Sequence, residues 1–190
     1  MNTPPNTVTT NTPRVALRAM EPEDLDWLYA VENNREVWNV GNTNVPYSRY
    51  VLHDYIANAT NDIYSDGQVR LIVENEEHEL IGMVDVFDFN AQHRRAEVSI
   101  VVRKEYRRKG YAAAAIDQIL DYSLHILHLH QLYAVVAEDN EASLALFLKK
   151  NFQTHNRLKE WLFDGVKYTD AIVLQKILWK KELKKFGRFK

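Results

Sequence analysis

Residues 96–115 read AEVSIVVRKEYRRKGYAAAA, and they predict a strand, a basic turn and the start of a helix. The apolar run from Ala96 to Val102 is typical of a buried strand. Gly110 lets the backbone approach a ligand closely, and the alanines after it begin a helix whose free N–H groups favour an anion. This pattern indicates a pyrophosphate site. The alternative is a solvated basic turn before a tightly packed helix.

The sequence on both sides of this stretch predicts alternating strands and helices. The expected strands are residues 15–19, 69–74, 80–89, 96–102, 131–137, 152–163 and 168–177, and the expected helices are residues 21–33, 48–61, 111–127 and 141–150. Asp164-Gly165 is a hairpin signal between the last two strands. We therefore expect an α/β fold (mixed α+β): a single domain with a central mixed sheet of about seven strands and helices on both faces.

The composition is that of a folded globular protein. Hydrophobic residues make up 46% and charged residues 26% of the 190 residues, which excludes disorder for most of the chain. The absence of cysteine excludes disulfides, thiolate nucleophiles and sulfur-bound zinc, and it fits a cytoplasmic protein. The six glycines lack the spacing of Walker and dinucleotide-binding loops, and no stretch is apolar enough to cross a membrane.

The two ends of the chain differ from the body. Residues 1–13 are rich in Thr, Asn and Pro, and we expect a disordered leader before a domain over residues 14–178. Residues 179–190 form a basic tail, with six Lys or Arg and one Glu. A solvated tail, or a rim on an oligomer, is the favoured interpretation over docking on nucleic acid or anionic lipid. Neither nucleic acid nor a membrane is an expected partner.

Two motifs connect the chain to a known family. Arg107-x-x-Gly110-x-Ala112 after a strand resembles the acetyl-CoA loop of the GNAT N-acetyltransferase superfamily. Residues 140–143, NEAS, begin a helix that ends in KKNF at residues 149–152, and this resembles the family's second CoA element. Within the superfamily the chain looks most like the bacterial spermidine/spermine (diamine) N-acetyltransferases, although ribosomal-protein and peptide N-terminal acetyltransferases share much of the pattern. The segments that carry the resemblance are residues 32–34, 46–47, 82–90, 93–97 and 140–141.

The resemblance implies acetyl-CoA as co-substrate and a primary amine, such as spermidine, as acceptor. We also expect a homo-oligomer. The strand at residues 131–137 would splay from the strand at 96–102 and open the cleft that the pantetheine arm enters. The backbone at Ile100, Val101 and Val102 would hold this arm. The remaining implied cofactor contacts are the pyrophosphate loop and the start of the later helix: Arg107, Arg108, Lys109, Gly110, Tyr111, Ala112, Asn140 and Ser143.

Three carboxylates on neighbouring strands are candidates for handling the amine. Glu97 is the first candidate for the general base, because a charge within an apolar strand is costly unless it is partnered or used. The alternative is an ion pair with Arg94 or Arg95. Asp85, Asp88 and Glu97 are candidates for substrate binding. A spacing of three places the two aspartates on opposite faces of the sheet unless a bulge intervenes.

The chain departs from the diamine enzymes at two places. Phe147 stands where the family has a tyrosine proposed to protonate the leaving thiolate, so Tyr111 or Tyr133 is an alternative donor. Residues 42–45, NTNV, replace an acidic pair associated with an allosteric polyamine site, so polyamine specificity stays open. A catalytically weak acyl-CoA-binding module is the rival hypothesis.

Three histidines gather near one expected helix end, at positions 125, 128 and 130. Polar or cationic side chains are favoured at a helix C-terminus for electrostatic reasons, and the chain has no HExxH motif. We therefore expect no metal.

Overall fold

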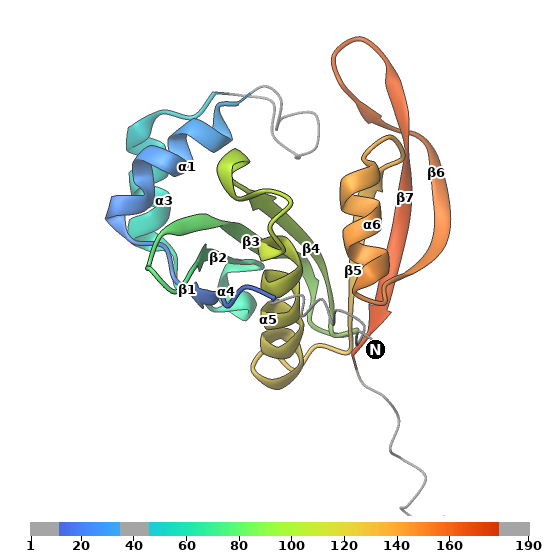
Figure 1. Cartoon of the computed structure of the whole chain (residues 1–190), viewed down its shortest axis with the longest axis horizontal. Coiled ribbons are helices and arrows are strands. Elements are labelled where there is room, and N and C mark those ends of the chain that lie inside the picture. The colour runs from blue at the N-terminus through green and yellow to red at the C-terminus, as the bar shows by residue number, and fades with distance from the viewer. Residues whose placement is uncertain (1–11, 35–45, 179–190) are drawn as a thin grey trace, which may run out of the picture.

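A seven-stranded mixed sheet runs through the computed structural model, which describes residues 12–34 and 46–178 (Figure 1). Its strands are β1 (Ala16–Arg18), β2 (Val69–Glu74), β3 (Leu80–Asn90), β4 (Arg95–Val102), β5 (Gln131–Ala137), β6 (Gln153–Phe163) and β7 (Tyr168–Ile177). Their order across the sheet is β1-β2-β3-β4-β5-β7-β6. β4 and β5 run parallel, and the other neighbouring strands of this described sheet are antiparallel.

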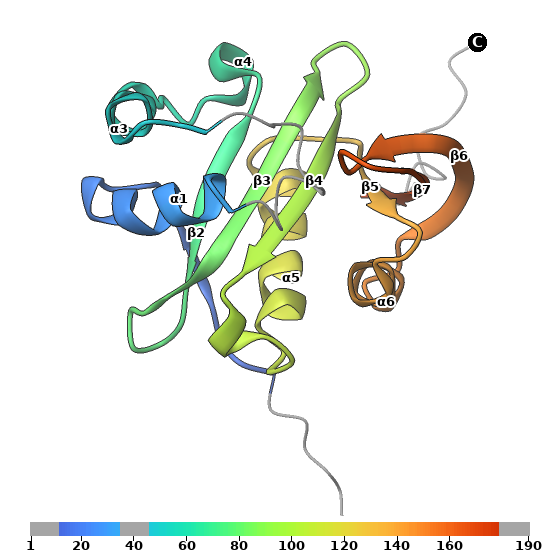
Figure 2. The same ribbon diagram turned by 90° about the horizontal axis from the view of Figure 1, so that it is seen from above.

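Helices cover both faces of the sheet, and each face has its own apolar core. The helical segments are η1 (Pro22–Asp24), α1 (Leu25–Glu32), α3 (Arg49–Asn58), α4 (Ile63–Asp66), η2 (Lys104–Tyr106), α5 (Tyr111–His125) and α6 (Glu141–Lys149). Figure 2 shows α1 and α3 on one side of β2–β4 and α5 on the other. Leu28 of α1 and Leu52 of α3 pack on Met83, whereas Ile116 of α5 and Phe147 of α6 belong to the core of the opposite face.

The predicted fold class, including a mixed sheet of seven strands with helices on both faces, is confirmed. The structure adds α4 and η2, which were not predicted, because segments of three or four residues carry no helical periodicity. It also divides the predicted helix over residues 21–33 into η1 and α1. Asp24, at that junction, is buried and accepts two hydrogen bonds from Arg18 (2.7 and 2.9 Å), so the local turn is set by a contact with β1.

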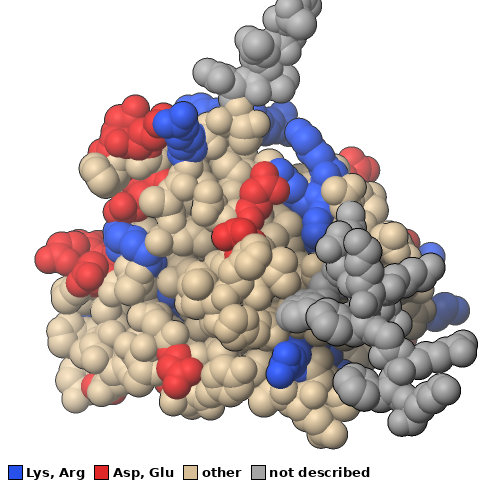
Figure 3. All heavy atoms as spheres, turned by 90° about the horizontal axis from the view of Figure 1, so that it is seen from below, with Lys and Arg blue, Asp and Glu red and all other residues tan. Residues whose placement is uncertain are grey.

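Several predictions concern segments that the structure does not describe. The leader is described only at Thr12 and Pro13, and the segment 42–45 and the tail 179–190 lie outside the described residues. In the described part of the chain, no helix has the length and apolar character needed to span a membrane. On the face drawn in Figure 3, acidic and basic side chains are interspersed among uncharged residues.

Candidate active site

β4 and β5 are paired only over their first residues. Parallel pairing joins residues 95–97 to residues 131–133 and ends there, whereas β3 stays paired with β4 as far as Val102. Figure 1 shows β5, β7, β6 and α6 diverging from β4. Beyond Glu97, the edge of β4 that faces β5 has no strand partner among the described residues. The N–H of Arg103 bonds to the Ile81 carbonyl on β3 (2.9 Å), and successive residues of a strand direct their backbone groups to opposite edges, so the backbone groups of Val101 point to β3 and, contrary to expectation, do not face the opening. Ile100 and Val102 can bond to a chain inserted into the opening between β4 and β5. This is the splay that the resemblance implied.

Two helices begin beside this opening. α5 follows β4 and α6 follows β5, so both N-termini lie near the carboxyl ends of the two parallel strands. Ligands of open α/β sheets bind in the crevice at this edge of the strands. The unpaired N–H groups and the dipole of a helix N-terminus also favour an anion. The arrangement can therefore hold a long ligand with an anionic group.

The loop that enters α5 exposes backbone to this edge. Gly110, the N-cap of α5, has a φ of +91°, and no side chain caps the helix. The N–H groups of Tyr111 and Ala112 precede the first bond within the helix, which runs from Ala114 to Gly110 (3.1 Å). Arg108 also has a left-handed φ, +60°. These left-handed residues turn the backbone directly into the free N–H groups at the start of α5, which favour an anion.

The basic side chains of the loop have unequal surroundings. Arg107 donates from Nε to the carbonyl of Val102 (2.9 Å), which fixes its guanidinium at the end of β4. Arg108 and Lys109 are exposed. An unanticipated neighbour is Pro13, since a Cβ placed on Gly110 would lie 2.9 Å from Pro13 Cδ. The segment before β1 therefore passes against the loop, a contact that nothing in the local sequence indicates.

The predicted site residues of α6 have structural partners. Asn140 is the N-cap of α6, and its side-chain oxygen accepts a hydrogen bond from the N–H of Ser143 (3.1 Å). Phe147 is only 3% exposed and packs edge-on against Phe152, with 5.0 Å between ring centroids. Its ring therefore completes an apolar core, and it brings no proton donor to the site.

A bulge in β3 decides where the aspartates lie. Phe87 pairs with Glu97 and Asn90 pairs with Arg95, so β3 has one residue more than β4 between these rungs. Asp88 lies in this irregular stretch with a φ of +48°. The bulge turns Asp88 toward the face that carries Glu97, which is the exception that the spacing argument allowed. Asp85, two residues before Phe87 along β3, shares this face.

The hydroxyl of Tyr133 completes the group. Tyr133 pairs in register with Glu97 across the last rung of the parallel ladder. Side chains of directly paired residues lie on the same face of a sheet. Tyr133 Oη donates a hydrogen bond to the carboxylate of Asp88. Sequence reasoning named Tyr133 only as one alternative donor, because the bulge that brings Asp88 to it has no local signature.

Glu97 is half-buried at the point where the strands part. Burial raises the pKa of its carboxyl to about 7, a hydrogen bond from the Val135 N–H partly opposes this, and the charge of Asp88 adds to it. The alternative interpretation, an ion pair with Arg94 or Arg95, has no counterpart in the contacts of the described residues. A carboxyl that titrates near neutral pH is suited to accept a proton in catalysis.

Asp85 already has a cationic partner. Arg70 of β2 binds it through two hydrogen bonds (2.7 and 3.0 Å) and also contacts Glu32 of α1 (2.5 Å). The charge of Asp85 is therefore compensated, unlike that of Glu97. Arg70 escaped the sequence analysis because its partners come from elements 15 and 38 residues away.

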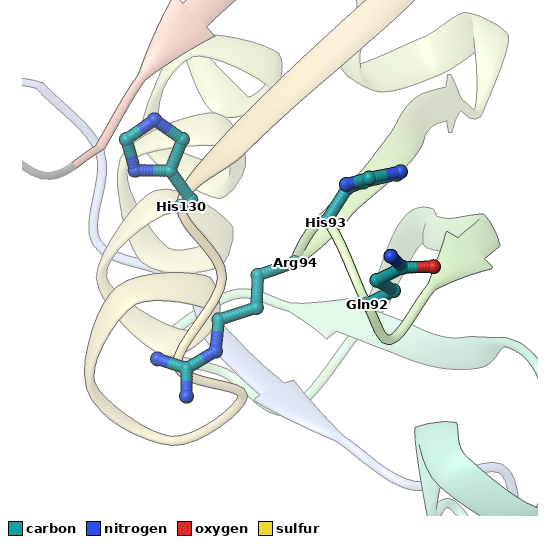
Figure 4. A pocket seen from close by; sticks show the side chains of 4 residues that line it. All are labelled: Gln92, His93, Arg94 and His130. Atoms are coloured by element: carbon teal, nitrogen blue, oxygen red, sulfur yellow. The ribbon is translucent and has the colours of Figure 1, made fainter.

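Two pockets lie outside this group. One of about 320 Å³ is at the start of β4 and β5, near the C-terminal end of α5, and Figure 4 shows its four lining side chains: Gln92, His93, Arg94 and His130. The other, of about 290 Å³, lies between α3, α4 and β2: Met20, Asp54, Tyr55, Asn58, Ala59, Asn61, Asp66, Gln68 and Arg70. No group of three or more potential metal ligands occurs within residues 12–34 and 46–178.

Comparison with known proteins identifies relatives over most of the chain. The family profile described as "Acetyltransferase (GNAT) domain" matches residues 14–153. The spermidine N(1)-acetyltransferase of Vibrio cholerae serotype O1 is 32% identical over 158 residues, covering 83% of this chain and 90% of that protein. The Escherichia coli K12 spermidine N(1)-acetyltransferase is 32% identical over 162 residues, with 83% of each chain covered.

Solved structures agree with the sequence relatives. The Vibrio cholerae spermidine N-acetyltransferase in complex with CoA and spermine has a TM-score of 0.76 at 31% identity, covering 87% of this chain and 96% of that one. A dodecameric structure of the Vibrio cholerae enzyme has a TM-score of 0.72 at 32% identity, covering 87% and 94%. The splayed strands, the glycine turn at α5 and these relatives lead to one assignment: the chain belongs to the GNAT acetyltransferase family and is an N-acetyltransferase.

Proposed function

We propose that this N-acetyltransferase transfers the acetyl group of acetyl-CoA to a primary amine of a polyamine such as spermidine. The observation that carries the proposal is the position of Glu97, a carboxyl with a pKa of about 7 at the rung where β4 and β5 part. The name of the Vibrio cholerae relative, whose complex holds CoA and spermine, supports the substrate class.

The opening between β4 and β5 suits two parts of acetyl-CoA: the anionic pyrophosphate and the pantetheine arm with its amides. The loop from Arg107 to Ala112 offers backbone amides to the pyrophosphate, and Arg108 and Lys109 add exposed positive charge. The free edge of β4 at Ile100 and Val102 offers hydrogen bonds to the pantetheine amides, whereas the backbone groups of Val101 point to β3. A ligand that runs along this edge points its thioester toward Glu97.

The acceptor side carries the acidic groups that a cationic amine requires. Asp88 and Glu97 attract an ammonium group before reaction. Glu97, directly or through water, takes a proton from the ammonium, and the neutral nitrogen attacks the thioester carbonyl carbon. The new C–N bond forms, the C–S bond breaks, CoA leaves as a thiolate, and the nitrogen releases its second proton to solvent as the amide forms. A thiol has a pKa of about 8.5, so the thiolate can depart partly unprotonated although Phe147 donates no proton.

We also propose that the enzyme is a homo-oligomer. The dodecameric structure of the Vibrio cholerae relative supports this, and so does an apolar patch on the β6–β7 hairpin. The patch consists of exposed apolar and aromatic side chains: Trp161, Phe163, Val166 and Tyr168. Sedimentation velocity measures the mass directly, and a species that remains at 22.2 kDa at every concentration contradicts the proposal.

The experiment that tests the proposed reaction is a turnover assay. Purified protein is incubated with acetyl-CoA and a panel of polyamines, aminoglycosides and peptides with free N-termini, and thiol release and acetylated product are both measured. We expect turnover with spermidine or spermine above that with the other amines. CoA binding without turnover on any amine would favour the acyl-CoA-binding module instead.

A further inference from the structure

Asp88 and Tyr133 form a hydrogen-bonded pair beside Glu97, and the proposed reaction uses only the charge of Asp88. Asp88 comes from β3, Glu97 from β4 and Tyr133 from β5, so three adjacent strands meet at this point. The Tyr133 hydroxyl donates to Asp88, and the Asp88 charge acts on Glu97. The three side chains are therefore one electrostatic unit at the end of the parallel ladder.

The backbone is arranged specifically to bring Asp88 there. A left-handed φ of +48° is unusual for a residue other than glycine and carries a conformational cost. Without the extra residue of the bulge, Asp88 would follow the strand alternation and lie on the face opposite Phe87 and Glu97. Such bulges occur next to active sites, where they redirect a side chain.

Tyr133 fixes the carboxylate that the bulge presents. A hydrogen bond from a hydroxyl to a carboxylate is charge-assisted and directional, so it restrains the rotation of Asp88. Burial raises the pKa of Tyr133, and its hydrogen bond to Asp88 and the nearby carboxylate charges add to this effect. Tyr133 therefore stays protonated and donating at neutral pH, which makes it a poor proton donor for a leaving thiolate.

We propose that Asp88 and Tyr133 are positioning residues for Glu97: the bulge and the hydrogen bond from Tyr133 hold the Asp88 carboxylate on the face of Glu97, so that the charge of Asp88 acts on Glu97 as it takes the proton of the attacking amine. This inference rests on the proposed acetyl transfer from acetyl-CoA to an amine. It assigns Asp88 a role through Glu97, in addition to the attraction of a cation.

The consequence for proton transfer is large. An alkylammonium has a pKa of about 10.4, and an ordinary glutamate has a pKa of about 4.3, a mismatch of roughly six units. A Glu97 pKa of about 7 removes nearly half of this mismatch. Each unit removed makes the deprotonated amine about ten times more populated in the transfer equilibrium. The like charge of Asp88 acts in this direction, because it disfavours the charged form of Glu97.

Other groups around Glu97 do not substitute for Asp88. On β5, the Val135 N–H favours the charged form of Glu97 and so acts in the opposite direction. On β3, the charge of Asp85 is compensated by Arg70, which also contacts Glu32. Arg95, on the strand of Glu97 itself, acts on Tyr133 by favouring its ionised form.

The test compares Asp88→Asn and Tyr133→Phe with the wild type. Asparagine tolerates a left-handed φ, so Asp88→Asn removes the charge while keeping the bulge. The controls are Asp121→Asn on α5 and Tyr50→Phe on α3; Tyr50 is 80% exposed. Two quantities are measured: the pH dependence of kcat for acetylation of spermidine, and the ¹³C chemical shift of the Glu97 carboxyl against pH, assigned by its loss in Glu97→Gln.

In the wild type we expect the pH profile of kcat to have an acidic limb with an apparent pKa near 7. This is the pKa of Glu97, which burial and the charge of Asp88 raise. Asp88→Asn removes a like charge, so the limb and the ¹³C titration both move down by about one unit. The rate on the alkaline side falls by about three- to tenfold, because a weaker base transfers the proton less efficiently. Tyr133→Phe moves both titrations in the same direction by a smaller amount, and the controls leave them unchanged.

The outcomes separate the positioning role from the reaction itself. Unchanged titrations in Asp88→Asn overturn the positioning role, even if turnover with spermidine stands and depends on Glu97. Lower rates in both variants with an unmoved acidic limb also overturn it, because that result means a structural role only. If no amine is acetylated, the proposed function fails, and the ¹³C titration alone still supports or overturns the effect of Asp88 on Glu97.

Discussion

The loop at residues 107–112 and the carboxylate group on the sheet face are built in opposite ways. The loop is one short run of chain whose working groups are backbone amides, and most of its side chains extend into solvent. The carboxylate group joins Asp88, Glu97 and Tyr133 from three strands, and its working groups are side chains; burial raises the pKa of Glu97 and of Tyr133.

The difference follows from the two tasks. Holding an anion requires only aligned N–H donors, which a glycine turn and a helix start supply locally. Accepting a proton from an ammonium requires a carboxyl with a raised pKa, and this needs burial and a like charge nearby. The first task is therefore encoded in consecutive residues, and the second depends on which strands become neighbours.

The largest expected effect is a loss of turnover that leaves CoA binding unchanged. Glu97→Gln removes the proposed proton acceptor, so we expect turnover with spermidine to fall by about 10²–10⁴-fold. The rise in Tm on adding CoA should stay as in the wild type, because the loop is untouched. Steady-state kinetics and thermal melts measure the two effects. A fully active variant with an unchanged pH profile would remove Glu97 from the mechanism.

The converse change affects the loop alone. Gly110→Val forces a side chain onto a backbone with φ +91°, where its Cβ would meet Pro13, and it blocks access to the amides before α5. We expect the stabilisation by CoA to disappear; in the wild type it amounts to about 2.7 kcal/mol at a hundredfold excess over Kd. Thermal melts with and without CoA measure the difference.

The matched control is Gly165→Val in the β6–β7 hairpin. Gly165 has a φ of +94°, and a Cβ there meets no atom within 4 Å. Gly165→Val therefore introduces the same kind of backbone strain as Gly110→Val but leaves the loop at residues 107–112 unchanged. This variant should keep the CoA shift. Equal protection of Gly110→Val and the wild type would place the pyrophosphate elsewhere.

A smaller effect is expected at α6, outside both regions. Phe147→Tyr adds a hydroxyl at the position where the family resemblance implies a tyrosine, and we expect the acetylation rate to rise by up to about tenfold, within the range of general-acid catalysis. CoA affinity should change little, because the ring stays in the apolar core against Phe152. The Tm should fall slightly, since Phe147 is 3% exposed and the new hydroxyl must find a partner. Rates that do not differ would mean that no acid is needed there.

The smallest effect concerns stability. The pKa of Glu97 is raised to about 7 in the folded chain, so folding favours the neutral carboxyl. Stability from this group is full below the ordinary pKa of about 4.5 and is lost as the pH rises through about 7. Glu97→Gln should therefore raise the Tm at pH 8 by ~2–6 °C and change it little at pH 5. A Tm difference that is the same at both pH values would contradict a shifted Glu97.

Much of the sheet could be read from local patterns. The bounds of β2, β5 and β7 equal the predicted ranges, because apolar strand residues bounded by turn signals are a local property. The bulge at Asp88 could not be read in this way, since a left-handed residue in β3 matters only through its register with β4. The Arg70–Asp85 ion pair could not be predicted for the same reason, because its members lie 15 residues apart on paired strands.

The sequence by itself determined the family, the order of the strands along the chain and the anion-binding loop, because each depends on neighbouring residues. Tertiary structure alone decided that Asp88 and Tyr133 lie beside Glu97 and that Asp85 forms an ion pair with Arg70. The physical reason is that a pKa responds to burial and to charges within a few ångströms. Those distances are fixed by strand pairing, bulges and splay, and not by spacing along the chain.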